Sequence, residues 1–227
     1  MTRIKFLSGF VSALVVLVLA SPGSAAKHRI EVLKEAPPKA GISPVILKSL
    51  QTTGYRIIRG KKRKICDIWL CKQISVKKFA GKNDIIYPWQ NGHLMGVVRY
   101  NNRGGDFRGQ RIGKGVYTLR YQHQPVDGAH VGTSPTRDFL LLTSTKMDKA
   151  VKPVDYKKLV KGSIAAAKSA HPAMLSLQRV KGKGKVPSIR NKTDHDWWIV
   201  RIQGKAQMGK KSKMIVMDLV VAGQAAE

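Results

Sequence analysis

The chain has 227 residues, of which 43% are hydrophobic, and 42 lysines and arginines against 13 acidic residues give it a formal net charge of +29. This hydrophobic content is enough to bury a core and excludes a disordered polycation. With only two cysteines, Cys66 and Cys71, the chain is neither a disulfide-stapled mini-scaffold nor a four-cysteine zinc cluster. The length fits one large domain or one domain with extensions.

Residues 1–26 have the order of a secretory signal peptide. Arg3 and Lys5 precede an apolar run over residues 9–20, and the helix breaker Pro22 then leads to small residues that end in Ala25-Ala26. A membrane anchor is the alternative, but a bilayer span takes about 20 apolar residues and this run is shorter. We therefore expect cleavage after Ala25 or Ala26, an exported protein (periplasmic or secreted), and no transmembrane segment in the mature chain.

The remaining chain predicts mostly short strands. Residues 27–54 begin with an alternating strand candidate, HRIEVLK, which is followed by two prolines and a short amphipathic stretch, and we expect a weakly structured leading segment there. From residue 55 onward, short alternating or apolar runs are bounded by Gly, Asn, Asp and Pro, as in antiparallel sheets. The predicted strands cover residues 55–59, 64–71, 93–100, 116–123, 137–143, 174–180, 197–203 and 213–221.

One helix is predicted between these strands, near residues 155–170. Asp155 is a suitable N-cap, an apolar stripe starts at Tyr156, and His171-Pro172 ends the pattern, although Gly162 is unfavourable inside a helix. The predicted fold class is therefore mainly β: an antiparallel sandwich or jelly-roll-like domain with one inserted helix, forming a single globular domain over residues 55–227.

The two cysteines are predicted to be core thiols. If residues 64–71 form one strand, Cys66 and Cys71 point to opposite faces with their Cα atoms about 16 Å apart, which is beyond disulfide reach. A broken strand is the alternative. Unpaired thiols in an oxidising compartment are expected to be buried.

The basic residues concentrate in two clusters, at 56–64 and 181–192. Such charge favours polyanionic partners, including acidic components of the cell envelope. The alternative is a solvated surface in an organism whose exported proteins are generally basic. Nucleic-acid recognition also requires aromatic residues among the charges, and neither cluster contains one. We therefore do not expect a nucleic-acid partner.

The segment 104–139 gathers turn residues, charges and two histidines. If residues 125–128 form a turn between paired strands, His123 lies opposite His130, close enough for both imidazoles to bind one transition metal, with Asp127, Asp106 or Asp138 as a third ligand. The alternative is that both histidines are ordinary polar residues on an exposed hairpin, or that one is buried and bonded to a carbonyl.

The same segment contains two similar triplets, Asp106-Phe107-Arg108 and Arg137-Asp138-Phe139. If they are neighbours, Asp106 pairs with Arg137 and Asp138 with Arg108, and such pairs hold loops rigidly. They are equally able to form the polar floor of a ligand site, with Arg120 binding an anion. The predicted ligand-binding residues are Asp106, Arg108, Arg120, Arg137 and Asp138.

Residues 106–142, together with 171–177 and 214–223, resemble uncharacterised exported bacterial proteins, notably from planctomycetes. The resemblance implies an exported single domain and brings no activity, cofactor or catalytic residue.

These observations favour a non-catalytic exported β-domain that binds a ligand or an anionic envelope partner through its basic surface and the 104–139 loops. One alternative is a metal-binding protein or metal-dependent enzyme centred on His123 and His130. Another is a carbohydrate-active protein that uses Asp106, Asp138 and an exposed tryptophan of the Trp197-Trp198 pair.

Overall fold

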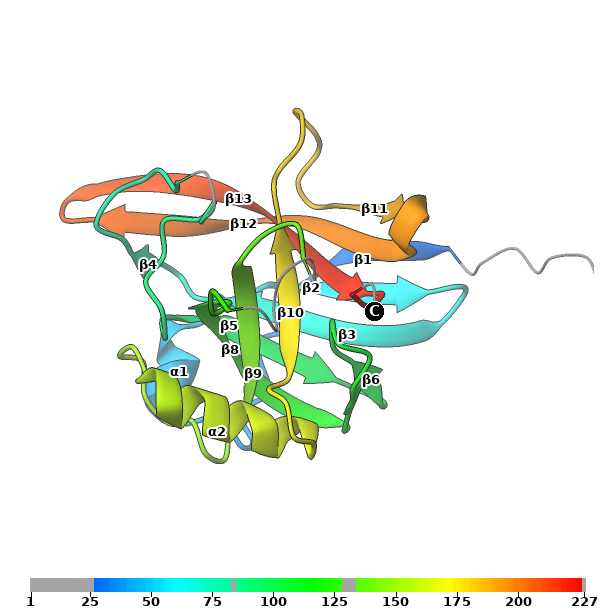
Figure 1. Cartoon of the computed structure of the whole chain (residues 1–227), viewed down its shortest axis with the longest axis horizontal. Helices are drawn as coiled ribbons and strands as arrows, with labels where there is room; N and C mark the ends of the chain where they lie inside the picture. The colour runs from blue at the N-terminus through cyan, green and yellow to red at the C-terminus, as the bar shows by residue number, and fades with distance from the viewer. Residues whose placement is uncertain (1–26, 83–84, 128–133, 226–227) are drawn as a thin grey trace, which may run out of the picture.

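The computed structural model describes residues 27–82, 85–127 and 134–225, so the predicted signal peptide and His130 lie outside the described residues. The helices are α1 (Pro44–Ser49), α2 (Tyr156–Ala167) and the short 3-10 helix η2 (Thr193–His195). The strands, shown in Figure 1, are β1 (His28–Leu33), β2 (Gly54–Arg59), β3 (Arg63–Leu70), β4 (Ile74–Ser75), β5 (Leu94–Tyr100), β6 (Gly104–Gly105), β7 (Arg111–Ile112), β8 (Gly115–His123), β9 (Asp138–Ser144), β10 (Met174–Gln178), β11 (Ser188–Lys192), β12 (Trp197–Met208) and β13 (Lys211–Ala222).

Eleven of these strands form one curled sheet. Its order is β1-β2-β3-β5-β8-β9-β10-β13-β12-β11, every pairing along this path is antiparallel, and β4 adds a short parallel pairing to β12. The sheet curls so far that its two ends, β1 and β11, come into contact (Figure 1). Side chains from both halves of the path therefore share one main core, including Ile57, Trp69, Leu119, Leu177, Ile202 and Leu219.

Helix α2 covers the outer face of β9. Its N-cap Asp155 accepts hydrogen bonds from the amides of Lys157 and Lys158, as expected from the sequence. Packing explains the glycine at position 162, because a Cβ there would lie 2.7 Å from Cγ2 of Thr143 on β9. The glycine that weakened the helix prediction thus allows the helix to approach the sheet.

The mainly β fold with one main helix is confirmed, and each predicted strand overlaps an observed one. The expectation of a weakly structured segment at 27–54 is corrected, because β1 pairs along its length with β2 and α1 inserts Ile46 fully into the core. Cys66 and Cys71 are free and buried, as predicted. Across the described ranges, no helix is long and apolar enough to cross a membrane.

Candidate functional site: a basic groove and an adjoining cavity

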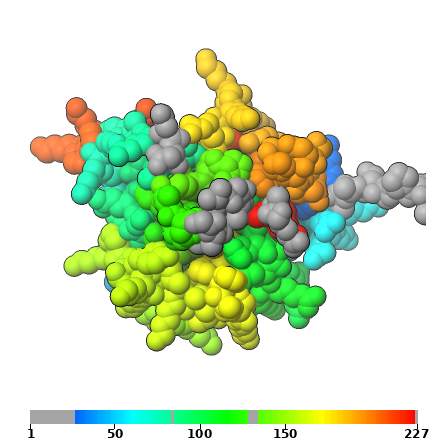
Figure 2. All heavy atoms as spheres, viewed as in Figure 1, coloured from blue at the N-terminus to red at the C-terminus, as the bar shows by residue number. Residues whose placement is uncertain are grey.

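A groove of about 690 Å³ opens where the curled sheet nearly closes. It lies between the β2–β3 hairpin, the 103–109 segment, the turn before β12 and the C-terminal residues. In Figure 2 the C-terminal residues reach the surface between the green 103–109 region and the orange start of β12, with the cyan hairpin beside them. Four segments that are distant in sequence therefore surround one hollow.

Three arginines give this groove its charge. Arg59, Arg63 and Arg103 line it and are exposed, and within the described residues their guanidinium groups have no hydrogen-bond or carboxylate partner. One exposed carboxylate, that of Asp196, also lines the groove. The local excess of positive charge is therefore open to a ligand. We refer to this site as the basic groove.

Other arginines of the fold are neutralised by buried carboxylates. Asp67 accepts hydrogen bonds from both Arg56 and Arg99, and Asp218 accepts two from Arg201. Burial raises the pKa of Asp67, but hydrogen bonds from Arg56, Asn101 and Arg99 outweigh burial and leave it lowered. Arg56, Arg99 and Arg201 thus have acidic partners, which the groove arginines lack within the described residues.

An aromatic ring lies beside these charges. Trp198 lines the groove, is partly exposed, and packs against the ring of His28, with 4.3 Å between ring centroids. Its neighbour Trp197 is buried, and its indole N–H donates to the carbonyl of Gln224 over 2.6 Å. Of the Trp197-Trp198 pair, Trp198 is therefore the one that reaches the surface. The groove thus combines cations with a stacking surface.

Asp106, which lines the groove, holds its own loop in place through hydrogen bonds. Its carboxylate accepts hydrogen bonds from the amides of Arg108, Gln110 and Met174 and from the Gln110 side chain, over 2.7 to 3.1 Å. Burial raises the pKa of Asp106, and these hydrogen bonds offset that effect only in part. The predicted pairing with Arg137 is wrong, because backbone amides supply the partners instead.

Asp138 is fully buried and also serves the fold. It accepts from the amides of Ile86 and Tyr87, each over 3.1 Å, and from the hydroxyl of Tyr121. Burial raises its pKa, with the hydrogen bonds acting against that shift. The predicted Asp138–Arg108 pair is therefore wrong. Arg137 instead donates from Nε and Nη2 to the carbonyl of Gln124.

Arg120 does not face an anion site. It is fully buried, and its five N–H groups donate to both carboxylate oxygens of Asp148 and to the carbonyls of Gly92, Ala150 and Lys152. No donor remains for a ligand, so the expected anion-binding role of Arg120 is corrected to a structural one. The sequence did not indicate Asp148 as its partner because 28 residues separate the two.

The metal hypothesis stays a prediction. His123 approaches the Tyr121 hydroxyl through Nε2 at 3.2 Å, Asp127 is exposed, and His130 lies outside the described residues. Over the part of the chain that the structure describes, no group of three or more His, Cys, Asp and Glu side chains is placed to hold a metal ion.

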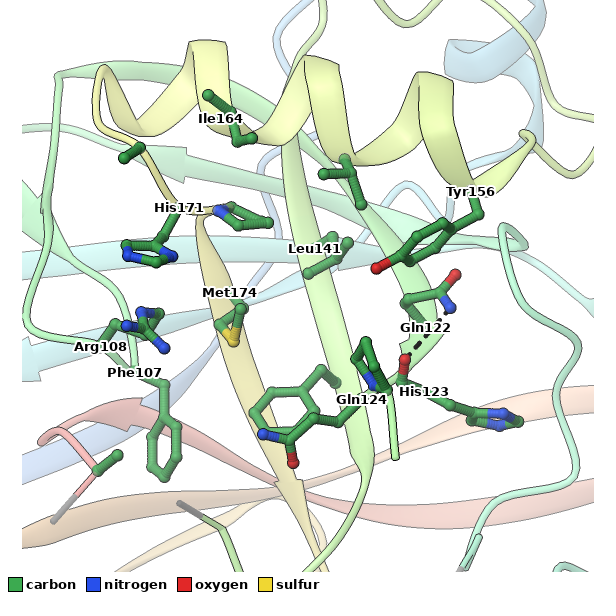
Figure 3. A pocket seen from close by; sticks show the side chains of 16 residues that line it. Phe107, Arg108, Gln122, His123, Gln124, Leu141, Tyr156, Ile164, His171 and Met174 are labelled. Carbon is green, nitrogen blue, oxygen red and sulfur yellow. Dashed lines mark hydrogen bonds between the residues drawn. The ribbon is translucent and has the colours of Figure 1, made fainter. Parts of the chain in front are cut away.

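A second hollow lies on the other side of the 104–109 segment, between α2 and the outer face of β8 and β9. It has a volume of about 280 Å³, and Arg108 lines it together with Phe107 and Phe139 (Figure 3). The structure therefore places Asp106 in the groove wall, Arg108 at this cavity, and Arg120 and Asp138 inside the fold.

Comparison of the chain with models of known protein families, with curated proteins and with solved structures gave no match.

Proposed function

We propose that this protein is an exported, non-catalytic binding domain whose basic groove holds an acidic polysaccharide or wall polymer of the cell envelope. The observation that carries the proposal is the convergence of Arg59, Arg63 and Arg103 on one groove without acidic partners in the described residues. Guanidinium groups bind phosphate, sulfate and carboxylate through paired hydrogen bonds, so free arginines in a groove suit a polymer that carries such groups.

The surroundings of the groove support a chain-like ligand. Lys61, Lys62 and Lys64 are exposed on the same β2–β3 hairpin as Arg59 and Arg63, and they extend the positive surface beyond the groove. The partly exposed ring of Trp198 offers an apolar surface on which a sugar ring can pack. The predicted signal peptide at 1–26 supports export to the compartment where acidic envelope polymers occur.

The test compares two triple variants of equal charge. The groove variant carries Arg59→Ala, Arg63→Ala and Arg103→Ala. Its matched control carries Lys205→Ala, Lys210→Ala and Lys211→Ala, which removes three exposed cations from the far β12–β13 hairpin. Both variants lower the net charge equally, so a difference between them reports location rather than total charge.

Retention on immobilised heparin, as a model sulfated glycan, is measured against a salt gradient. We expect the groove variant to elute at clearly lower salt than wild type and the hairpin variant to elute close to wild type. Equal shifts of the elution salt concentration in both variants would mean that net charge alone attracts the protein to heparin, and would refute the groove as the binding site. Stronger retention on single-stranded DNA than on heparin would contradict the proposed ligand class.

A further inference from the structure

The cavity beneath α2 is a second hollow with apolar walls and polar ends. Its apolar lining comes from the loop, two strands and the helix: Phe107, Phe139, Leu141, Val160, Ile164 and Met174. At about 280 Å³ it lies near the lower end of the range for small-molecule sites, roughly 300–1,000 Å³. Its size therefore suits a small ligand rather than a polymer.

An arginine and a histidine lie at one end of this cavity. Figure 3 shows Arg108 and His171 at the same end, next to Met174. Both are exposed, and across the described ranges neither the guanidinium of Arg108 nor the ring of His171 has a hydrogen-bond partner. Among the described residues, no Asp or Glu lines the cavity. Within that part of the chain, an anionic group at this end would therefore meet only positive or neutral side chains.

The opposite end carries a buried acceptor. Gln122 is only 6% exposed, and its Nε2 donates to the carbonyl of His123 over 3.2 Å. That bond fixes the amide orientation, because a flipped amide would place two oxygens against each other. Oε1 is then left without a partner among the described residues, next to the ring of Tyr156 (Figure 3). An unpaired buried acceptor is costly, and a ligand hydroxyl would satisfy it.

We infer that this cavity binds a small amphiphilic carboxylate, whose apolar body lies against α2 and the sheet and whose charged group faces Arg108 and His171. The charge arrangement selects an anion over a neutral amphiphile, and Gln122 favours a ligand with a hydroxyl at its far end. This site is separate from the basic groove: Arg59, Arg63 and Arg103 do not line the cavity. It therefore does not depend on the proposed polyanion binding.

The test is calorimetric titration with octanoate, 8-hydroxyoctanoate and octanol. We expect octanoate to bind more tightly than octanol. Arg108→Gln should weaken octanoate roughly tenfold or more, since charged hydrogen bonds are stronger than neutral ones, and leave octanol unchanged. The matched control is Arg111→Gln, an exposed arginine on neighbouring β7 that does not line the cavity, and it should leave both affinities unchanged.

Two further variants probe the walls. Ile164→Trp fills the cavity and should abolish octanoate binding, while Gln122→Leu should remove only the advantage of 8-hydroxyoctanoate over octanoate. If Ile164→Trp does not fold, the octanoate affinities of Arg108→Gln and Arg111→Gln still test whether octanoate binds in this cavity. No octanoate binding by wild type at millimolar concentration, or equal losses in the two arginine variants, would overturn the inference. The groove triple variant should bind octanoate normally, so failure of either site is distinguishable from failure of the other.

Discussion

Replacing Asp148 by alanine tests the structural role of Arg120. The Arg120 side chain is fully buried and that of Asp148 is 5% exposed, with Nε–Oδ2 and Nη2–Oδ1 distances of 2.6 and 2.8 Å. Thr118 also donates to Oδ2 over 2.6 Å. Asp148→Ala removes the carboxylate and leaves a guanidinium charge inside the protein with carbonyl partners only.

The expected cost follows from burial. Breaking a buried ion pair on one side typically costs about 3–5 kcal/mol, a large part of the roughly 5–15 kcal/mol that stabilises a domain. An exposed pair gives the matched comparison: the side chains of Arg29 and Glu31 are 46% and 49% exposed. Glu31→Ala should therefore cost less than about 1 kcal/mol.

Urea denaturation followed by tryptophan fluorescence measures both variants, with the midpoint and the m-value reported together. The double variant Arg120→Met/Asp148→Leu should recover part of the loss, because an apolar pair has no uncompensated charge. Recovery is incomplete because the carbonyls of Ala150 and Lys152 lose a donor. A loss below about 1 kcal/mol for Asp148→Ala would refute the reasoning, since it would mean that Arg120 is hydrated or re-paired.

Three other predictions concern the fold. Gly162→Ala should lower the free energy of unfolding by about 1 kcal/mol or more, because overpacking against Thr143 outweighs the gain of about 1 kcal/mol in helix propensity, and Thr143→Ser should rescue it in a double-mutant cycle. The lowered pKa of Asp67 contributes stability that is complete above the ordinary aspartate pKa, near 4, and is lost as pH falls through the folded value. Asp67→Asn should therefore flatten the acid limb of a stability-against-pH curve, and an unchanged limb would contradict this. Burial raises the pKa of Cys71 to about 11 and also raises that of Cys66, so a thiol reagent at pH 8 should label neither until urea unfolds the chain.

Much of the fold is predictable because its signals are local. Alternation along β8 places Leu119 and Tyr121 on the core face, and the Asp155 cap marks the start of α2. In the leading segment, the alternation of HRIEVLK indicates a strand, but its pairing with β2, which makes the segment well structured, is not visible in the sequence. Gly162 has a low intrinsic helix propensity. The sequence does not reveal why a glycine is needed there, because the reason is the close packing of α2 against Thr143 on β9.

The candidate site was predictable only in part. The 56–64 cluster contains Arg59 and Arg63, and their inclusion in a basic surface is predictable from charge alone. Arg103 and Trp198 join them only because the sheet curls until its ends meet, which is a long-range result of packing. The predicted roles of Asp106 and Asp138 are wrong because backbone amides supply most of their hydrogen bonds, and the sequence does not show which amides lie near a side chain.

The salt dependence of heparin affinity tests the central claim most directly. Each cation that contacts the polymer releases counterions, so the slope of log K against log salt counts the contacts. We expect the groove triple variant to have a slope smaller than wild type by about 3, one unit for each arginine removed. The Lys205, Lys210 and Lys211 control should keep the wild-type slope. An unchanged slope in the groove variant, or equal reductions in both variants, would contradict binding in the basic groove.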